Sequence, residues 1–310
     1  MITSMRTLVT GGQGLLARHV AAALRGQGHA VTIVSRRPAE VRGRAVDWAG
    51  VRDAMSEVDA VVNLAGASLT HRRWHAERKH EILESRVDCT NRLVAAIAAA
   101  RPRPTVLVNA SATAVYGPRA DAPLDETTSP GDGFVAEVYR RWEAAAVGAR
   151  ALGVRVVLLR FGVVLASDGG VLPRLLPLYR AGLGGPLGRG TQWMSWIHRD
   201  DAVALVLAAL VDAGWEGPLN AVTPSAVRQR DFARTLARAV HRPAVVRVPG
   251  LALRVALGEM ATLLLGGQRA VPAALTAAGY SFRYPDLETA LAESVGGDGR
   301  AAMPAPPGIR

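Results

Sequence analysis

The stretch Thr10-Gly11-Gly12-Gln13-Gly14-Leu15-Leu16-Ala17 lies between an apolar run at 7–9 and an amphipathic stretch at 18–25. A strand that ends in a glycine-rich turn and opens a helix directs backbone N–H groups and the positive end of the helix dipole at one place, where a pyrophosphate can bind. The spacing puts Gly11 in the tight turn, Gly14 where the backbone approaches phosphate, and Ala17 where helix packs on strand. We therefore predict a dinucleotide site that includes Gly11, Gln13, Gly14 and Leu15.

A second apolar run, at 29–34, ends in Ser35-Arg36-Arg37. An acidic residue at this place binds the ribose 2′-hydroxyl of NAD, whereas an arginine accommodates the additional phosphate of NADP. This chain has no acid there, and a guanidinium is a planar fork of donors that suits phosphate. The sequence therefore predicts NADP(H), held by Ser35, Arg36 and Arg37. The alternative is that both arginines are solvated charges of an arginine-rich protein.

Strand-like and helix-like patterns alternate through the first half of the chain. Further buried strands are predicted at 59–66, 105–113 and 154–160, with helices at about 76–100 and 134–152. This alternation implies a parallel sheet that is covered on both faces, which is an α/β, doubly wound Rossmann domain. Leu64, Ala65 and Gly66 end one strand with mostly small side chains, so a cofactor can lie against the backbone there.

The alternation loosens from about residue 162. We predict a Rossmann NADP-binding domain over 5–165, to which 190–225 returns, a smaller C-terminal substrate lobe over 166–189 and 226–294, and a flexible tail over 295–310. Residues 193–198 are predicted to form one aromatic-rich strand. Asp200 or Asp201 is the predicted N-cap of the helix that follows.

Composition limits the class of partner. The 310 residues carry a net charge of +11, nearly all of it from arginine, but basic residues are scattered and aromatic residues make up only 5%. This pattern favours a small-molecule substrate over nucleic acid. No uncharged apolar run reaches the roughly 18 residues that span a bilayer, so no membrane partner is expected. With the single cysteine Cys89, a cytoplasmic protein is expected, and no metal site is predicted.

A set of short stretches is shared with one group of enzymes. They are Thr10 to Gly14, Asn63 to Gly66, Arg73-Trp74 with Lys79 and Ser85-Arg86, Ser111-Ala112, Tyr116-Gly117, Trp142-Glu143, 159–165, 184–188, 193–198 and Gly258 to Met260. Together they resemble the extended short-chain dehydrogenase/reductase superfamily, and within it the NAD(P)-dependent epimerase-like family that has its own characteristic C-terminal domain. The resemblance covers roughly residues 7–292. It implies a bound nicotinamide cofactor and a C-terminal substrate lobe, and in relatives the long helix pairs with its twin, which makes a homodimer an expectation.

The usual catalytic set of that superfamily is incomplete in this chain. The set has a Ser or Thr five residues before the Gly of a Tyr-Gly pair, and counting back from Gly117 places Ala112 there, with hydroxyls at Ser111 and Thr113 on either side. Successive strand residues point to opposite faces, so both hydroxyls need not reach one pocket. Ser111 is expected to hydrogen-bond cofactor or backbone.

The Tyr-x-x-x-Lys pair of the set has no cation here. One register places Val135 at the tyrosine position, and the other makes Tyr139 the tyrosine but places Glu143 at the lysine position. Without a cation, a tyrosine near the ordinary pKa of about 10 is a poor base. Tyr116 and Tyr139 are the candidate proton donors, and Ser111 completes the candidate catalytic set.

Three functions are consistent with these residues. The first is an NADP(H)-dependent oxidoreductase or epimerase-like enzyme that acts on a small carbonyl or hydroxyl compound. The second is a sensor that binds NADP(H) without turnover, which the incomplete catalytic set favours. The third is a non-redox lyase or cyclase that uses the same cleft.

Overall fold

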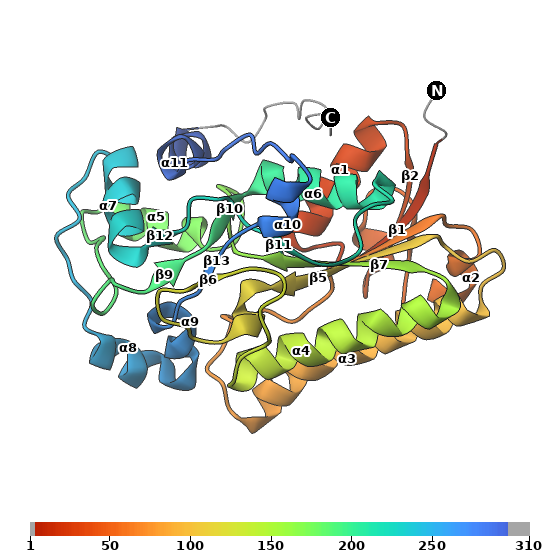
Figure 1. Cartoon of the computed structure of the whole chain (residues 1–310), viewed down its shortest axis with the longest axis horizontal. Coiled ribbons are helices and arrows are strands. Elements are labelled where there is room, and N and C mark those ends of the chain that lie inside the picture. Colours follow the sequence, from red (N-terminus) through yellow and green to blue (C-terminus); the bar gives the residue numbers. More distant parts are fainter. Residues whose placement is uncertain (1–3, 297–310) are drawn as a thin grey trace.

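A seven-stranded parallel sheet forms the centre of the computed structural model, which describes residues 4–296 (Figure 1). Its strands are β1 (Arg6–Thr10), β2 (Ala30–Val34), β3 (Ala45–Val46), β4 (Ala60–Asn63), β5 (Val106–Ala112), β7 (Arg155–Phe161) and β11 (Gly217–Ala221). Their spatial order is β3-β2-β1-β4-β5-β7-β11. The direction of the order changes between β1 and β4, and ligands of open parallel sheets bind beside such a point.

Helices cover both faces of the sheet (Figure 1). The two layers are α1 (Leu15–Gly26) with α6 (Arg199–Val211), and α2 (Val51–Met55) with α3 (Ala76–Ala99) and α4 (Phe134–Val147). Because the strands are buried on both sides, they are nearly continuous runs of aliphatic residues. This architecture confirms the predicted doubly wound fold. Through the described residues, no helix is both long and apolar enough to cross a bilayer.

Smaller elements build the C-terminal lobe, at the left in Figure 1. Its helices are α5 (Leu172–Arg180), α7 (Gln229–Ala239), α8 (Gly250–Leu257), α9 (Thr262–Leu265) and α11 (Leu287–Gly296), while α10 (Ala273–Ala277) packs on β11 near the middle of Figure 1. Short strand pairs connect it to the sheet: β8 (Val163–Leu165) with β10 (Trp196–His198), β9 (Trp193–Met194) with β12 (Val227–Arg228), and β6 (Pro123–Leu124) with β13 (Arg269–Ala270). The short 3-10 helices are η1 (Pro38–Glu40), η2 (Thr113–Tyr116), η3 (Gly148–Leu152) and η4 (Gly258–Ala261).

The structure corrects the prediction of one strand at 193–198. Ser195 interrupts it, so that β9 and β10 pair with different partners. The Ser195 hydroxyl donates to the Gln268 carbonyl at 2.9 Å and accepts from the Ala270 N–H at 2.9 Å. These hydrogen bonds to the segment at 268–270 therefore end the strand. The alternation of residue types along 193–198 does not reveal them.

The predicted N-cap of α6 is also wrong. His198 caps the helix, because its Nδ1 accepts from the Asp200 N–H at 3.2 Å. Asp201 instead accepts from the backbone N–H groups of Arg283 and Tyr284, at 2.8 and 2.9 Å, which ties α6 to the C-terminal segment. Of the predicted tail at 295–310, Val295 and Gly296 belong to α11, and the remaining positions lie outside the described residues.

Candidate active site

The glycine turn after β1 fits closely against two neighbouring segments. Gly11 has φ +73°, a conformation that favours glycine, and a Cβ there would lie 2.6 Å from the Leu64 carbonyl oxygen. A Cβ on Gly12 would lie 2.1 Å from Ile33 Cγ2. The Gly14 N–H donates to the Gly11 carbonyl at 2.7 Å and closes the turn. No role was predicted for Gly12, because its contact is with Ile33 on the next strand of the chain.

No side chain caps the N-terminus of α1, so its first N–H groups are open to an anion. Gly14 is the N-cap, it provides no side-chain acceptor, and the first turn has no acidic residue. Gln13 and Gly14 are exposed, and Leu15 is half-buried. The first N–H groups of a helix have no intrahelical acceptor, so this end of α1 is suited to a phosphate.

Thr10 joins the glycine turn to the end of β4. Its hydroxyl donates to Asn63 Oδ1 at 2.6 Å and accepts from the N–H groups of Leu64 and Ala65 at 3.1 and 3.2 Å. The structure thus brings the predicted segments 11–15 and 64–66 together along the switch point of the sheet. This role of Thr10 was not predicted, although a polar residue that ends an apolar strand beside the glycine turn was a usable signal.

The end of β2 separates the two arginines that were predicted to bind phosphate. Ser35 is buried, and its hydroxyl accepts from the Arg37 N–H at 3.1 Å. The Arg37 guanidinium pairs with Glu40 at 3.3 Å. Arg36 is exposed and forms no ion pair or side-chain hydrogen bond with any residue from 4 to 296. Of the two guanidiniums, that of Arg36 is therefore available to an anion.

Ser111 faces α4 rather than open space. Its hydroxyl donates to Glu143 Oε1 at 2.6 Å, and Glu143 forms a bidentate pair with Arg160, with distances of 2.9 and 2.8 Å. Burial lowers the pKa of Arg160, but the hydrogen bonds and the charge of Glu143 outweigh it and raise this pKa above its ordinary value. Glu143, which stands at a lysine position of the superfamily pattern, therefore belongs to a neutralised buried pair.

Tyr116 is enclosed in the same network. The side chain is fully buried, and its hydroxyl donates to Asn220 Oδ1 at 2.8 Å and lies 2.9 Å from the Asp125 carbonyl. Arg160 donates to the same hydroxyl at 3.0 Å. Burial raises the pKa of Tyr116. This environment links η2 to β11 and does not favour Tyr116 as a proton donor to a ligand.

Tyr139 has a different environment on α4. The side chain is 7% exposed, and its hydroxyl forms no hydrogen bond within the described part of the chain. The guanidinium carbon of Arg86, on α3, lies 5.8 Å from the centre of the Tyr139 ring and 5.2 Å from the Trp142 ring. Of the candidate donors, Tyr139 is the one whose hydroxyl remains available.

Arg86 belongs to one of the stretches shared with the family, but no role was predicted for it. The residues Ile82, Arg86, Thr90, Leu93 and Ile97 follow one another at helical spacing on the buried side of α3. A charged residue on that buried face indicated that its side chain contacts a polar or charged group, or an aromatic ring. Neither His71 nor His198 lies beside these residues in a free form, since His71 is exposed and His198 caps α6.

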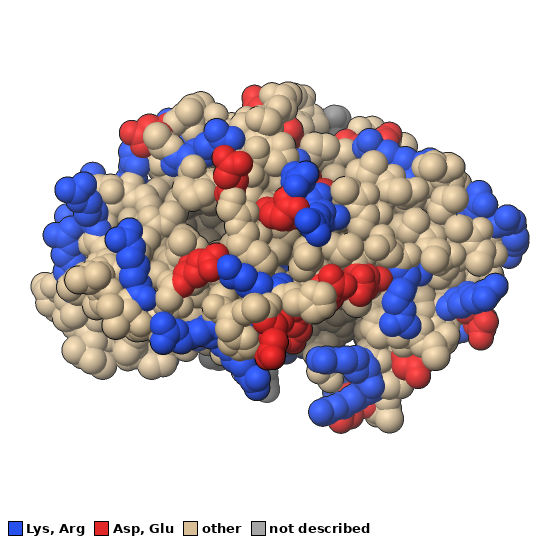
Figure 2. Space-filling model, turned by 90° about the horizontal axis from the view of Figure 1, so that it is seen from below, with Lys and Arg blue, Asp and Glu red and all other residues tan. Residues whose placement is uncertain are grey.

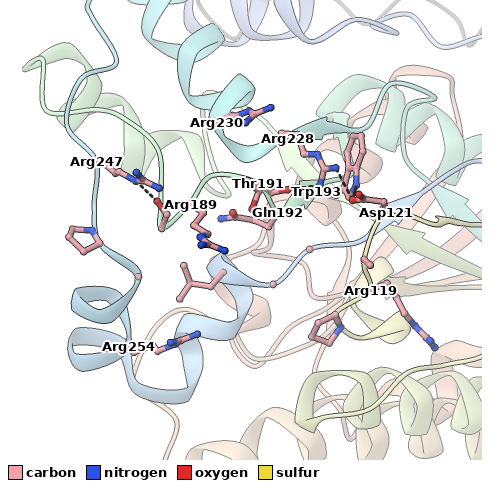
Figure 3. Close-up of a pocket in the computed structure, with 18 of the residues that line it drawn as sticks. Arg119, Asp121, Arg189, Thr191, Gln192, Trp193, Arg228, Arg230, Arg247 and Arg254 are labelled. Carbon is pink, nitrogen blue, oxygen red and sulfur yellow. Dashed lines mark hydrogen bonds and ion pairs between the residues drawn. The ribbon is translucent and has the colours of Figure 1, made fainter.

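A basic pocket lies between the lobe and the loop that follows η2 (Figure 3). Its volume is about 1080 Å³, and among residues 4–296 Asp121 is the one acidic residue that lines it. The arginines that line it are Arg119, Arg189, Arg228, Arg230, Arg247 and Arg254. Basic side chains also predominate at this end of the molecule in Figure 2, where the lobe helices lie. The pocket is therefore suited to an anionic group.

Some of these arginines already have partners. Arg228 pairs with Asp121 at 2.7 Å and stacks over the Trp193 ring at 3.9 Å, while Trp193 Nε1 donates to Asp121 at 2.9 Å (Figure 3). In contrast, the side chains of Arg189 and Arg254 form no ion pair or hydrogen bond with any described residue. These two positive charges are not compensated by the protein.

Known proteins resemble nearly the whole chain. Residues 7–219 match the NAD dependent epimerase/dehydratase family, and 248–294 match a domain of unknown function, DUF1731. An epimerase family protein of Mycobacterium leprae is 41% identical over 288 residues, which is 91% of this chain and 93% of that protein.

Two solved structures are also similar. The human epimerase family protein SDR39U1, solved with NADPH, has a TM-score of 0.88 and 34% identity and covers 94% of this chain and 100% of that chain. A nucleoside-diphosphate sugar epimerase of Corynebacterium glutamicum has a TM-score of 0.79 and 34% identity, and covers 95% of this chain and 59% of that chain. The chain therefore belongs to the NAD dependent epimerase/dehydratase family, within the extended short-chain dehydrogenases/reductases.

Proposed function

We propose that the protein is an NADP(H)-dependent oxidoreductase or epimerase-like enzyme that acts on a small carbonyl or hydroxyl compound. The observation that carries the proposal is the cradle formed by the glycine turn, the uncapped start of α1 and residues 64–66. Side chains are excluded at Gly11 and Gly12, because a Cβ would meet Leu64 or Ile33. The N–H groups at the start of α1 fit a pyrophosphate. The similar human protein was solved with NADPH.

The end of β2 supports NADP(H) over NAD(H). No acidic residue stands at 35–37 to bind a ribose 2′-hydroxyl, and the Arg36 guanidinium has no partner among the described residues. A guanidinium can donate two parallel hydrogen bonds to the 2′-phosphate of NADP. The 2′-hydroxyl of NAD cannot accept such a pair of bonds. Arg36 is therefore the residue that would hold the 2′-phosphate.

Tyr139 is the proposed proton donor of the reaction. The nicotinamide supplies hydride transfer when it is bound. The hydroxyl of Tyr139 has no partner in the described chain, so it is free to give its proton to a substrate oxygen when a carbonyl becomes a hydroxyl, and to take it back in the reverse direction. Ser111 holds Glu143 at 2.6 Å and so serves to position α4 against β5.

The basic pocket supports a substrate that carries an anionic group. Arg189 and Arg254 have uncompensated charges beside it, and guanidiniums are suited to phosphate and carboxylate. The similar protein of Corynebacterium glutamicum is described as a nucleoside-diphosphate sugar epimerase, whose substrate class has such groups. We therefore propose a phosphorylated carbonyl or hydroxyl compound.

The test is calorimetry with NADPH and NADH, followed by turnover of a panel of carbonyl and hydroxyl compounds, each with and without a phosphate. We expect tighter binding of NADPH, oxidation of one NADPH per carbonyl reduced, and a preference for phosphorylated compounds. The variant Tyr139→Phe is expected to lose most of the rate. The matched control is Tyr280→Phe, which removes a buried hydroxyl that has no hydrogen bond among the described residues.

The other two functions give different results in the same experiments. NADPH binding without turnover of any compound in the panel would indicate a sensor. The absence of binding to either cofactor would contradict the proposal and favour non-redox chemistry in the cleft.

A further inference from the structure

Arg86 is a buried guanidinium on α3 without an acidic partner. The side chain is 6% exposed, its Nη1 donates to the Ile82 carbonyl at 2.9 Å, and its Nε has no hydrogen-bond partner in the described residues. No carboxylate of residues 4–296 forms an ion pair with it. A buried charge that is not paired is destabilising, so other contacts or a function must account for it.

Two aromatic rings of α4 lie beside this guanidinium. Its carbon is 5.8 Å from the centre of the Tyr139 ring and 5.2 Å from that of Trp142, within the range of cation–π contacts. Trp142 is fixed by its own hydrogen bond, from Nε1 to the Thr90 hydroxyl at 2.9 Å. The stacked arrangement therefore holds Arg86 and Tyr139 together across the two helices.

The guanidinium also lies at the edge of the proposed cofactor cleft. A Cβ placed on Gly66 would be 2.9 Å from Arg86 Cζ and 3.1 Å from its Nη2. Gly66 ends the segment that Thr10 joins to the glycine turn. Arg86 thus stands between the backbone that borders the cleft and the tyrosine that is proposed to act there.

The elements packed around Tyr139 carry other charged and polar groups, and these have partners of their own. On α4, Arg140 and Arg141 both pair with Glu137. On α4, Glu143 lies one turn further on and forms its bidentate pair with Arg160 of β7. On β5, Ser111 is neutral and donates to the same Glu143. On α3, the Glu84 carboxyl group shares a hydrogen bond with Asp88, which raises the pKa of Glu84, and His80 Nδ1 lies 3.9 Å from it. Arg86 therefore provides the uncompensated charge next to the Tyr139 ring.

We propose that Arg86 is the cation that makes Tyr139 a competent acid and base, in place of the lysine that the superfamily pattern puts on α4. This inference rests on the proposed function. The O–H bond of Tyr139 breaks as a substrate oxygen gains the proton, and the remaining phenolate takes a proton back from water. A neighbouring guanidinium stabilises that phenolate and stays charged throughout, because arginine does not deprotonate in proteins.

The first test needs neither cofactor nor substrate. The parent protein and the variants Arg86→Gln and Arg86→Lys are titrated with alkali, and the absorbance of tyrosine phenolate is followed. The same titrations are made on proteins that also carry Tyr139→Phe, and the difference between the two gives the contribution of Tyr139. We expect this phenolate to form at higher pH in Arg86→Gln than in the parent protein, and Arg86→Lys to stay close to the parent. Equal titrations in the parent and in Arg86→Gln would overturn the proposal.

Arg92→Gln is the matched control. Arg92 is on the same helix and also stacks on a tryptophan, with its guanidinium carbon 5.0 Å from the Trp48 ring, but its partner lies beside β3. The Tyr139 phenolate is expected to be unchanged in this variant. A shift in Arg92→Gln as large as that in Arg86→Gln would show an effect of net charge alone and would contradict the proposal. Circular dichroism of every variant checks the fold.

The second test uses turnover of a substrate from the panel. Arg86→Gln is expected to lower kcat by at least about tenfold with little change in KM, and to move the pH at which the rate is half-maximal. Arg86→Lys is expected to retain most of kcat. If the parent enzyme turns over nothing, the proposed function fails, and the phenolate titration still decides the role of Arg86. If the parent is active and Arg86→Gln retains its rate and pH profile, this inference alone is wrong.

Discussion

Gly12 sits so close to Ile33 that any side chain would force one of them to move. A Cβ would be 2.1 Å from Ile33 Cγ2, far inside van der Waals contact. The backbone of Gly12 does not have a positive φ, so the obstacle is space rather than conformation. The shape of the proposed cofactor site therefore depends on the fit between the turn after β1 and Ile33 of β2.

Gly12→Ala is expected to destabilise the protein and to abolish NADPH binding. The clash with Ile33 displaces the turn, and overpacking of this kind costs about 1–3 kcal/mol. Thermal unfolding and calorimetry measure the two effects. Gly26→Ala is the control, because a Cβ there meets nothing within 4 Å. In the background Ile33→Ala the loss of stability caused by Gly12→Ala is expected to shrink, and an unchanged loss would rule out the contact as its cause.

Arg36→Ala is expected to weaken NADPH binding by about tenfold or more and to leave NADH binding nearly unchanged, since one charge-assisted bond to phosphate is worth about 1.5–3 kcal/mol. Arg37→Ala is the matched control, because the Arg37 guanidinium is paired with Glu40. Calorimetry with both cofactors measures the affinities. An equal loss for NADPH and NADH would show that Arg36 does not read the 2′-phosphate.

At the scale of elements, α6 depends on contacts that its own sequence does not predict. Its cap is the preceding histidine, and Asp201 in its first turn holds the N–H groups of Arg283 and Tyr284. The centre of the His198 ring also lies 4.0 Å from that of the Tyr284 ring, with the two planes tilted at 45°. Helix α6 is thereby fixed to the C-terminal segment at the point where the chain passes between lobe and sheet.

His198 is expected to make stability fall as the pH decreases from 7 to 5. Burial lowers the pKa of His198 from its usual 6.5 to about 4, so between these values the unfolded chain takes up a proton that the folded chain does not. The loss should be about 2 kcal/mol. In His198→Asn, which keeps an acceptor for the cap but does not titrate, urea unfolding should depend less on pH. A pH dependence identical to that of the parent would contradict this assignment.

The buried strands and the glycine turn were predictable because they depend on neighbours in sequence, whereas the order of the strands in the sheet comes from the structure. The runs at 7–9, 29–34 and 105–113 are β1, β2 and β5, and parallel order follows from the alternation with helices. The family resemblance was likewise predicted and is confirmed by the match over 7–219. These elements could be predicted because the pattern that specifies each strand or helix lies within one short segment of the sequence.

The environment of the tyrosines was not predictable in the same way. Arg86 and Tyr139 are 53 residues apart in the chain, and their contact exists only because α3 and α4 lie side by side (Figure 1). The sequence also leaves open which tyrosine is enclosed, and the structure encloses Tyr116 through Asn220 and Arg160. Contacts across such separations depend on packing, which composition and spacing do not encode.

At the scale of the whole molecule, exposed apolar side chains bear on the expected homodimer. Among the described residues, the large apolar side chains that are most exposed are Leu178, Leu183, Val211, Val245, Val246, Leu251 and Val255. None of them lies on α3 or α4. A stable homodimer usually buries an apolar patch, so pairing through the long helix α3 has no apolar support here and stays a prediction.

The basic pocket predicts a second anion site, whose lining includes no residue of the glycine turn or of 64–66. Its walls come from the loop at 118–121, the segment at 188–193, the start of α7, and the segments at 247–254 and 265–267, so a ligand there would join the lobe to the Rossmann domain. Binding to the folded state alone raises stability by about 2.7 kcal/mol at one hundred times Kd. Inorganic pyrophosphate, added to protein saturated with NADPH at low ionic strength, is therefore expected to raise Tm by at least about 2 °C.

The double variant Arg189→Ala with Arg254→Ala is expected to lose this increase while keeping the increase that NADPH causes, because neither residue belongs to the glycine cradle. Removal of two charges by itself weakens the attraction for anions, so the control must carry the same change from +11 to +9. Arg42→Ala with Arg52→Ala provides it, since both arginines are exposed, near β3 and α2, and outside the pocket lining. If both double variants lose the effect of pyrophosphate equally, net charge explains it. A loss confined to Arg189 and Arg254 means that pyrophosphate is bound at the pocket between lobe and sheet.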